Sequence, residues 1–137
     1  MTQSEEKSLI FDTSAIVRII KKDRNYQTVL NLLQKSAESK SGFISALTTF
    51  ETCLVTSRLS QHKANETISY LEASNLQFKP VTHEIAKKAI LLKLNYHNLN
   101  ISMADAIIIQ TGIEENAEII TADKEWLNVK EAKVKIV

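Results

Sequence analysis

Short apolar segments and longer amphipathic segments alternate along this chain of 137 residues. Five short runs rich in Ile, Val, Leu or Phe have the length of buried strands. The segments between them carry apolar residues at helical spacing. Strands separated by helices predict a mainly parallel sheet, because each parallel connection must cross back over the sheet. The expected fold is therefore a three-layer α/β/α domain with a mainly parallel central sheet of about five strands.

The expected strands cover residues 8–11, 42–46, 76–81, 118–121 and 134–137. One helix should follow residues 12–14. Others should cover about 24–38, 48–59, 63–73, 82–96 and 103–115, with a short turn or helix at 126–127. In the segment 63–73, Ile68 and Leu71 should face the core. Pro80 cannot donate to a ladder, so its strand should lie at an edge or end there. Residues 1–7 are expected to be a flexible tail, and residues 8–137 one domain.

The rare residue types exclude several classes of site. The chain has two glycines, Gly42 and Gly112, so neither a G-x-G-x-x-G fingerprint nor a P-loop can exist. A single cysteine, Cys53, excludes an intrachain disulfide and a cysteine-rich zinc site. The three histidines are scattered, without a paired spacing, which disfavours zinc. The start of the chain is polar and acidic, and the apolar runs are short, so we expect a cytoplasmic protein without membrane contact.

Four acidic residues stand near the junctions of the expected elements. Asp12 ends the first strand, Glu51 lies in the helix after the second, and Asp123 follows the fourth. The carboxyl ends of parallel strands meet at one edge of a sheet, where ligands bind, so these three should lie together. Asp105 is one turn into the helix that precedes the fourth strand. Its position is less constrained, because a helix and a loop precede it.

Converging carboxylates need a counter-charge. Two unit charges 4 Å apart repel by about 1 kcal/mol in water and by about 4 kcal/mol at an effective dielectric of 20. A divalent cation removes that repulsion, and all-oxygen ligands favour Mg²⁺ or Mn²⁺ over zinc. Such an ion can activate a water for attack on phosphorus. The pattern therefore indicates a metal site for phosphate chemistry.

Helix capping is the competing interpretation of the same acids. Thr48-x-x-Glu51 and Ser102-x-x-Asp105 both match the capping-box pattern. Asp12 could cap the first helix, and Asp123 the last short one. The two interpretations coexist, since a capping carboxylate still has a free oxygen.

Four segments resemble the signature segments of PIN-domain nucleases, most closely VapC-type toxins. They are Leu9-Ile10-Phe11-Asp12-Thr13-Ser14-Ala15, Thr48-Thr49-Phe50-Glu51, Ile101-Ser102-Met103-Ala104-Asp105-Ala106 and Ile120-Thr121-Ala122-Asp123-Lys124-Glu125-Trp126. The resemblance runs in order and spacing from about residue 8 to the C-terminus. Trp126 departs from the Phe of many relatives, which should not alter the acidic site.

The resemblance implies a Mg²⁺- or Mn²⁺-dependent endoribonuclease, the toxin of a type II toxin–antitoxin pair. By the motif match, Asp12, Glu51, Asp105 and Asp123 form the catalytic and metal-binding quartet. Thr13, Ser14 and Thr121 fall where the family places supporting hydroxyls. The resemblance also implies a homodimer, an RNA substrate and a cognate antitoxin protein.

The charge balance agrees with a phosphate-bearing substrate. The whole chain carries +1, but with the four acids set aside 17 basic residues face 12 acidic ones, a net charge of +5. Phosphate contacts from Lys and Arg give affinity without sequence preference. The candidates for substrate binding are Lys21, Lys22, Arg24, Arg58 and Lys124. We expect Lys87, Lys88 and Lys93 to be solvated, and Trp126 to close the edge of the core.

Other functions remain open at this point. A non-catalytic PIN-like module could bind RNA or a protein, and an RNA-maturation nuclease could act outside a toxin–antitoxin pair. Haloacid-dehalogenase-type phosphatases need a second acid two residues after the first, where this chain has Ser14. Response-regulator receivers need adjacent acids where Asp12 stands alone. Both phosphate-handling classes are therefore disfavoured.

Overall fold

Five parallel strands form one sheet in the order β3-β2-β1-β4-β5. The computed structural model describes residues 7–137, so the predicted tail lies, apart from Lys7, outside the described residues. The strands are β1 (Leu9–Phe11), β2 (Gly42–Ser45), β3 (Gln77–Lys79), β4 (Glu118–Thr121) and β5 (Lys133–Ile136). The three-layer α/β/α prediction is confirmed, and each strand lies within two residues of its predicted bounds.

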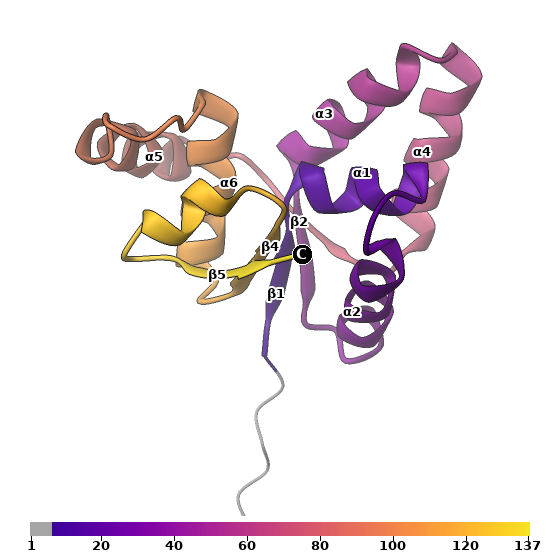
Figure 1. Cartoon of the computed structure of the whole chain (residues 1–137), viewed down its shortest axis with the longest axis horizontal. Helices are drawn as coiled ribbons and strands as arrows, with labels where there is room; N and C mark the ends of the chain where they lie inside the picture. The colour runs from indigo at the N-terminus through magenta and orange to yellow at the C-terminus, as the bar shows by residue number, and fades with distance from the viewer. Residues whose placement is uncertain (1–6) are drawn as a thin grey trace, which may run out of the picture.

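The helices connect the strands and cover both faces of the sheet (Figure 1). They are α1 (Thr13–Lys21), α2 (Tyr26–Glu38), α3 (Ala46–Ser57), α4 (Gln61–Ala73), α5 (His83–Asn95) and α6 (Met103–Glu114), followed by a 3₁₀ helix, η1 (Lys124–Asn128). Most begin at a polar residue whose side chain accepts a hydrogen bond from the first turn, which satisfies an otherwise free backbone N–H. These caps are Asp12, Ser45, Ser60, Thr82, Ser102 and Asp123.

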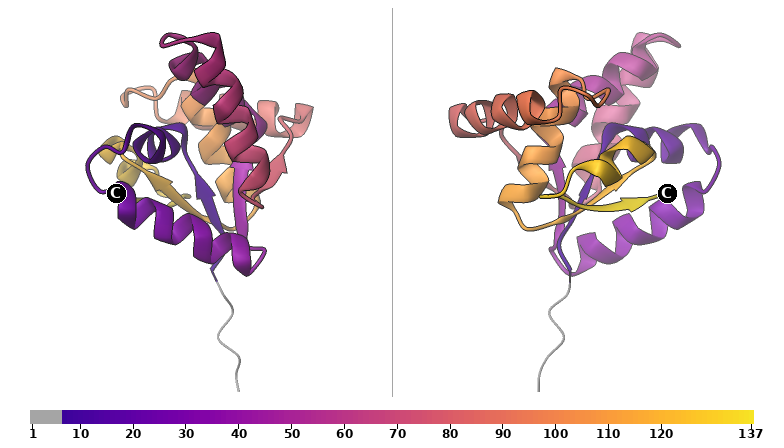
Figure 2. Two further views of the ribbon diagram at one scale, coloured as in Figure 1. Left: turned by 90° about the vertical axis from the view of Figure 1, so that its right-hand side faces the viewer. Right: turned by 60° about the vertical axis from the view of Figure 1, so that its left-hand side comes forward.

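The central strands β1, β2 and β4 are buried on both faces of the sheet, because they are apolar at consecutive positions. On one face, Phe11 and Ile44 pack in a cluster with Ile16 of α1 and Val29 of α2. On the other face, Ile10, Phe43 and Ile119 pack in a second cluster with residues of α5, α6 and η1. Figures 1 and 2 show α1 and α2 on one side of the sheet, with α5 and α6 on the other. Trp126 is fully buried in the second cluster, as predicted.

Helix α6 packs very closely on the sheet at Gly112. A Cβ at this position would lie 2.6 Å from Ile119 Cγ1 and 3.1 Å from Ile10 Cγ2. Neither distance leaves room for a methyl group in a close-packed core. The absence of a side chain at Gly112 therefore lets the backbone of α6 pack close to β1 and β4.

Helices α3 and α4 form a hairpin that extends beyond the sheet (Figure 1). The inward face predicted for α4 is half wrong: Leu71 is buried, but Ile68 is exposed and Thr67 takes the inner position. Thr67 faces α3, where its hydroxyl donates to Thr56 Oγ1 at 3.1 Å. Strand β3 lies at an edge of the sheet and ends before Pro80, as the proline predicted.

The carboxyl ends of all five strands share one edge of the sheet. The polar junctions β1–α1, β2–α3 and β4–η1 lie there. The ladder continues past β5, where the Val137 N–H donates to the Thr121 carbonyl at 3.0 Å. Within residues 7–137, no helix has both the length and the apolar character needed to cross a bilayer.

Candidate active site

Asp12 is the most buried of the four candidate acids, with 5% of its surface exposed. It follows β1 and caps α1, and its Oδ1 accepts from the Thr13 N–H at 2.7 Å. Its Oδ2 accepts from Ser14 Oγ at 2.7 Å and from Thr121 Oγ1 at 2.8 Å. Burial raises the pKa of Asp12 from 3.8 to about 6, with the charge of Asp105 adding to the rise and the hydrogen bonds opposing it. Ionising Asp12 in the folded protein therefore costs free energy, because the buried carboxylate has lost most of its hydration.

Ser14 and Thr121 join the β1–α1 junction to the β4–η1 junction. Ser14 Oγ accepts from the Ala122 N–H at 3.0 Å, and Thr121 Oγ1 accepts from the Asp123 N–H at 3.1 Å. Both hydroxyls also donate to Asp12. Each thus uses a donor and an acceptor at once, which fixes its rotamer. The two junctions that carry Asp12 and Asp123 are therefore parts of one hydrogen-bonded network.

Glu51 lies on α3 and is tied to the first junction by a side-chain contact. The Thr13 hydroxyl donates to Glu51 Oε1 at 2.7 Å, although the residues are 38 positions apart in the chain. The predicted capping box at Thr48 and Glu51 is wrong, because α3 begins at Ala46 and Ser45 is its cap. Glu51 is thereby one and a half turns into the helix, with no cap to serve, and its carboxylate is available to the site.

Asp105 combines the two roles that the sequence suggested. It forms the predicted capping box, with its N–H donating to Ser102 Oγ at 3.1 Å and its Oδ2 accepting from the Ser102 N–H at 3.0 Å. Burial raises the pKa of Asp105, the hydrogen bonds with Ser102 lower it, and the charge of Asp123 raises it. Asp105 therefore interacts electrostatically with both Asp12 and Asp123. These charge interactions agree with the prediction that Asp105 lies near Asp12 and Asp123.

Asp123 ends the network as the cap of η1. Its Oδ1 accepts from the Glu125 N–H at 3.0 Å, while its own N–H is bound by Thr121. Capping, the competing interpretation, is thus correct for Asp12, Asp105 and Asp123. Each of these carboxylates nevertheless retains lone pairs that its protein donors do not use.

The oxygen atoms of the four acidic side chains are suitable ligands for a hard divalent cation. The four side chains offer only carboxylate oxygens, the ligands that Mg²⁺ and Mn²⁺ take in proteins. Burial, and to a smaller extent the charge of a neighbouring carboxylate, raises the pKa of Asp12 and of Asp105. As the side chains stand in residues 7–137, no three Asp, Glu, His or Cys groups are close enough to enclose an ion. Binding would therefore require the carboxylates to turn from their present hydrogen bonds.

The predicted substrate-binding residues are dispersed on the surface. Arg24, Arg58 and Lys124 are exposed, as are Lys21 and Lys22 at the end of α1. Lys93 departs from its predicted solvated position: it is half-buried, and its Nζ donates to the Ile101 carbonyl at 2.7 Å. Lys93 also lowers the pKa of Asp105, although burial and the charge of Asp123 outweigh it. Sequence reasoning missed this contact, because α5 shows only an ordinary lysine at a helix end.

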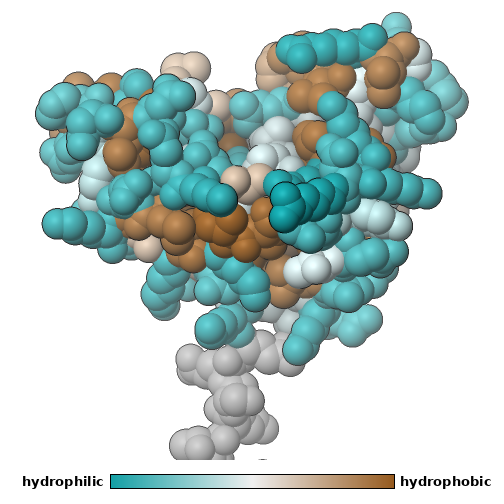
Figure 3. Space-filling model, in the orientation of Figure 1, coloured by the Kyte–Doolittle hydropathy of each residue, from teal (hydrophilic) through white to brown (hydrophobic). Residues whose placement is uncertain are grey.

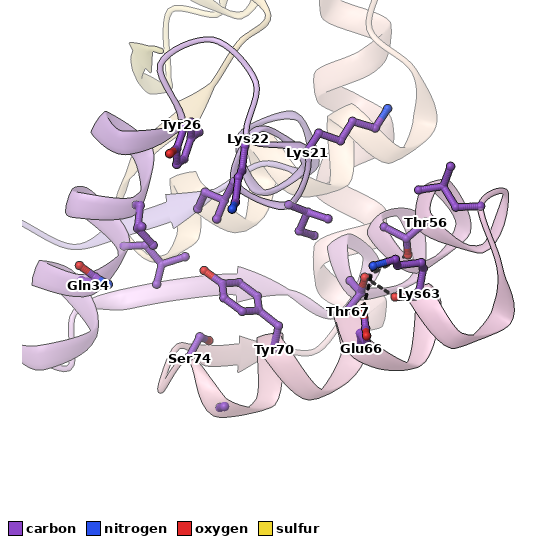
Figure 4. A pocket seen from close by; sticks show the side chains of 16 residues that line it. Lys21, Lys22, Tyr26, Gln34, Thr56, Lys63, Glu66, Thr67, Tyr70 and Ser74 are labelled. Carbon is purple, nitrogen blue, oxygen red and sulfur yellow. Dashed lines mark hydrogen bonds and ion pairs between the residues drawn. The ribbon is translucent and has the colours of Figure 1, made fainter.

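A groove of about 820 Å³ lies between the α1–α2 pair and the α3–α4 hairpin (Figure 4). Its floor is mainly apolar, with Ile19, Leu33 and Leu59 among the lining side chains. Lys21, Lys22 and Lys63 are among the residues that line it, with Lys63 paired to Glu66 at 3.3 Å, and Tyr26 and Tyr70 face it from α2 and α4. Two of the predicted substrate-binding lysines thus line this groove.

A model of the PIN domain family matches residues 9–132. Solved structures share the fold at low sequence identity. VapBC2 from Rickettsia felis, bound to a DNA fragment from its promoter, has a TM-score of 0.77 and 18% identity over 93% of this chain and 97% of that chain. VapC20 from Mycobacterium tuberculosis, described as a sarcin-ricin loop cleaving toxin, has a TM-score of 0.74 and 15% identity. The match covers 88% of this chain and 94% of that chain.

FitAcB from Neisseria gonorrhoeae has a TM-score of 0.72 and 22% identity, over 92% of this chain and 95% of that chain. Among curated proteins, no sequence matches this chain.

Proposed function

Because the chain belongs to the PIN domain family, we propose that it is a divalent-metal-dependent endoribonuclease that hydrolyses RNA phosphodiester bonds. One observation carries the proposal. Three acids from different junctions interact through their charges, and the fourth, Glu51, is bonded to Thr13 beside Asp12. A folded protein gains no stability from such crowding, since like charges repel. Partly buried carboxylates whose charges interact are typical of a site that holds a cation.

In this proposal, Asp12, Glu51, Asp105 and Asp123 hold Mg²⁺ or Mn²⁺. The bound ion would lower the pKa of a water and offset negative charge on the phosphodiester. Ser14 and Thr121 orient Asp12, while Thr13 orients Glu51 and Ser102 orients Asp105. Losing a donor that fixes a ligand carboxylate in this way typically costs about 10–100-fold in metal affinity or activity.

Protonation of Asp12 would limit the reaction at low pH. With a pKa of about 6, the Asp12 carboxyl carries a proton over much of the mildly acidic range. A protonated carboxyl is a poor ligand for a cation. We therefore expect cleavage to rise with pH through about 6 as Asp12 ionises.

The test is cleavage of RNA by the purified protein with Mn²⁺, and again with excess chelator. Asp12→Asn and Asp105→Asn should abolish cleavage while circular dichroism shows the fold retained. Asp23→Asn is the matched control, because Asp23 is exposed beyond α1 and outside the site. Wild-type cleavage that persists in chelator, or in both site variants, would overturn the proposal. Absence of cleavage in every condition would favour the non-catalytic RNA- or protein-binding module.

We propose further that the protein is the toxin of a type II toxin–antitoxin pair. One similar structure, from Klebsiella pneumoniae, is described as a toxin–antitoxin complex and has a TM-score of 0.70 and 21% identity. The apolar groove flanked by Lys21 and Lys22 suits an amphipathic partner helix with acidic residues. Co-expression with the product of an adjacent reading frame should yield a complex without RNA cleavage. Leu59→Glu should lose the complex and keep cleavage; cleavage by an intact complex would count against this role.

A second copy of the chain is the other proposed partner. Helix α3 exposes Phe50 and Leu54, and α5 exposes Ile90, Leu91 and Leu94. Apolar patches are visible in Figure 3 where Figure 1 has α5 and the α3–α4 hairpin. Apolar surface of this extent is typical of an interface between proteins. We take it as support for the homodimer that the sequence resemblance implies.

A further inference from the structure

The loop between α5 and α6 is held at its backbone by two charged side chains of opposite sign. Glu125 Oε2 accepts from the Asn100 N–H at 3.1 Å, and Lys93 Nζ donates to the Ile101 carbonyl at 2.7 Å. The two contacts fall on consecutive residues, just before the cap Ser102. The Ile101 side chain, 2% exposed, anchors the same point in the core. The start of α6, and with it Asp105, is therefore fixed from several sides.

We call the contacts of Glu125 with Asn100 and of Lys93 with Ile101 the clamp. Glu125 has a second contact that links the clamp to the candidate site. Its backbone N–H donates to Asp123 Oδ1 at 3.0 Å. One residue thus binds the Asp123 carboxylate with its backbone and the segment leading to Asp105 with its side chain. A separate contact joins the same parts of the chain, since Tyr96 Oη donates to Glu131 and accepts from the Lys130 N–H at 3.0 Å. Two links therefore hold the α5–α6 loop against the segment that follows β4.

We propose that Glu125 is a positioning residue, which sets the placement of Asp105 relative to Asp123 by holding the α5–α6 loop, with Lys93 holding that loop from α5. This inference rests on the proposed function, since Asp105 and Asp123 are two of its proposed metal ligands. Asp105 and Asp123 carry like charges, and the contacts of Glu125 and Lys93 hold the start of α6 against their repulsion.

The charge of Glu125 invites another explanation, in which its carboxylate is one more ligand of the cation. The two explanations differ in what the side chain must supply. A positioning residue needs only an acceptor for the Asn100 N–H, which the amide oxygen of glutamine also provides. A ligand needs the negative charge, which glutamine lacks. Glu125→Gln and Glu125→Ala therefore separate the two roles. Both leave the backbone N–H that binds Asp123 in place.

The experiment measures amide hydrogen exchange by NMR, together with Mn²⁺ affinity by calorimetry. In Glu125→Ala, the amides of residues 100–105 should exchange about tenfold faster, as expected for the loss of one hydrogen bond. Its Mn²⁺ affinity should fall by about tenfold or more, as for other supporting residues of metal sites. Glu125→Gln should restore both to within about twofold of the wild type. Glu72→Gln is the matched control, because Glu72 is exposed on α4, and should match the wild type.

Each result bears on the proposal separately. Unchanged exchange at residues 100–105 in Glu125→Ala would overturn it. Loss of Mn²⁺ affinity in Glu125→Gln, with normal exchange, would also overturn it in favour of a ligand role. If the wild type binds no Mn²⁺, the proposed function fails, but the exchange rates still decide whether Glu125 holds the loop. Lys93→Met should speed exchange at the same amides, and a rate equal to the wild type would remove Lys93 from the clamp.

Discussion

Replacing Asp12 by asparagine should make the protein more stable at neutral pH while removing its activity. The pKa of Asp12 rises from 3.8 to about 6 on folding, mainly through burial. Such a rise corresponds to about 3 kcal/mol of unfavourable free energy for the ionised side chain in the native state. Asparagine has nearly the same shape and carries no charge. Above pH 6.5, Asp12→Asn should therefore gain stability.

The gain should be smaller than the full penalty. Ser14 and Thr121 both donate to Asp12 Oδ2, and an amide nitrogen in that place cannot accept from them. Reorienting these hydroxyls should cost about 1 kcal/mol. We expect a net gain of about 1–2 kcal/mol at pH 7 without metal.

The pH dependence fixes the sign of the effect. Below pH 3.8 Asp12 is protonated in both states, and its titration contributes nothing. Between about pH 4 and 6 the unfolded state ionises first, so the native state binds more protons and wild-type stability falls as pH rises. Well above pH 6 both states are ionised, and the loss is complete. The variant lacks this titration, so its advantage should appear only as pH rises through that window.

Urea unfolding at pH 4, 5, 6 and 7 in chelator measures the difference directly. The wild type, Asp12→Asn and the control Asp23→Asn should be compared at each pH. A constant difference between wild type and Asp12→Asn across the series would refute the reasoning. So would an advantage that shrinks as pH rises. Adding Mn²⁺ at pH 7 should stabilise the wild type but not Asp12→Asn, because the neutral amide is a weaker ligand.

Three further predictions concern other parts of the molecule. Thr13→Val should release Glu51 and lower RNA cleavage by about tenfold, and Thr13→Ser should restore it; equal activity in both would show that the 2.7 Å bond is dispensable. Gly112→Ala should reduce the free energy of unfolding by about 1–3 kcal/mol, because its Cβ would lie 2.6 Å from Ile119; an unchanged urea midpoint would contradict the tight packing of α6. Leu91→Glu, on the exposed face of α5, should convert a dimer to a monomer in light scattering; a mass that does not change would exclude this face as the interface.

Most of the fold could be predicted because its signals are local. Each strand is a short apolar run, and most helices begin at a Ser, Thr or Asp that caps them. The error at Thr48 arose because two possible caps stand three residues apart, and Ser45 at the end of β2 takes the role. The error at Ile68 has a tertiary cause, since α4 turns its threonine to α3 and leaves an isoleucine exposed.

The candidate site could be predicted only in outline. Parallel strands predicted the shared edge, and the charge interactions of Asp105 agree with that placement. The links between side chains depend on rotamers and on distant segments, such as the 109 positions that separate Asp12 from Thr121. The same holds for Lys93 and Glu125, whose partners are backbone atoms in a loop. No periodicity in the sequence marks a residue that binds backbone.

The parallel arrangement of the strands also bears on how the protein should be handled. Strand β1 enters the sheet at the edge opposite the acids. The Val137 N–H, by contrast, donates a hydrogen bond to the carbonyl of Thr121, two residues before Asp123. An affinity tag or fluorophore fused after Val137 would emerge beside the carboxylates, and a polyhistidine tag there would bring its own metal-binding imidazoles. Because β1 enters the sheet at the far edge, N-terminal fusions should be preferred.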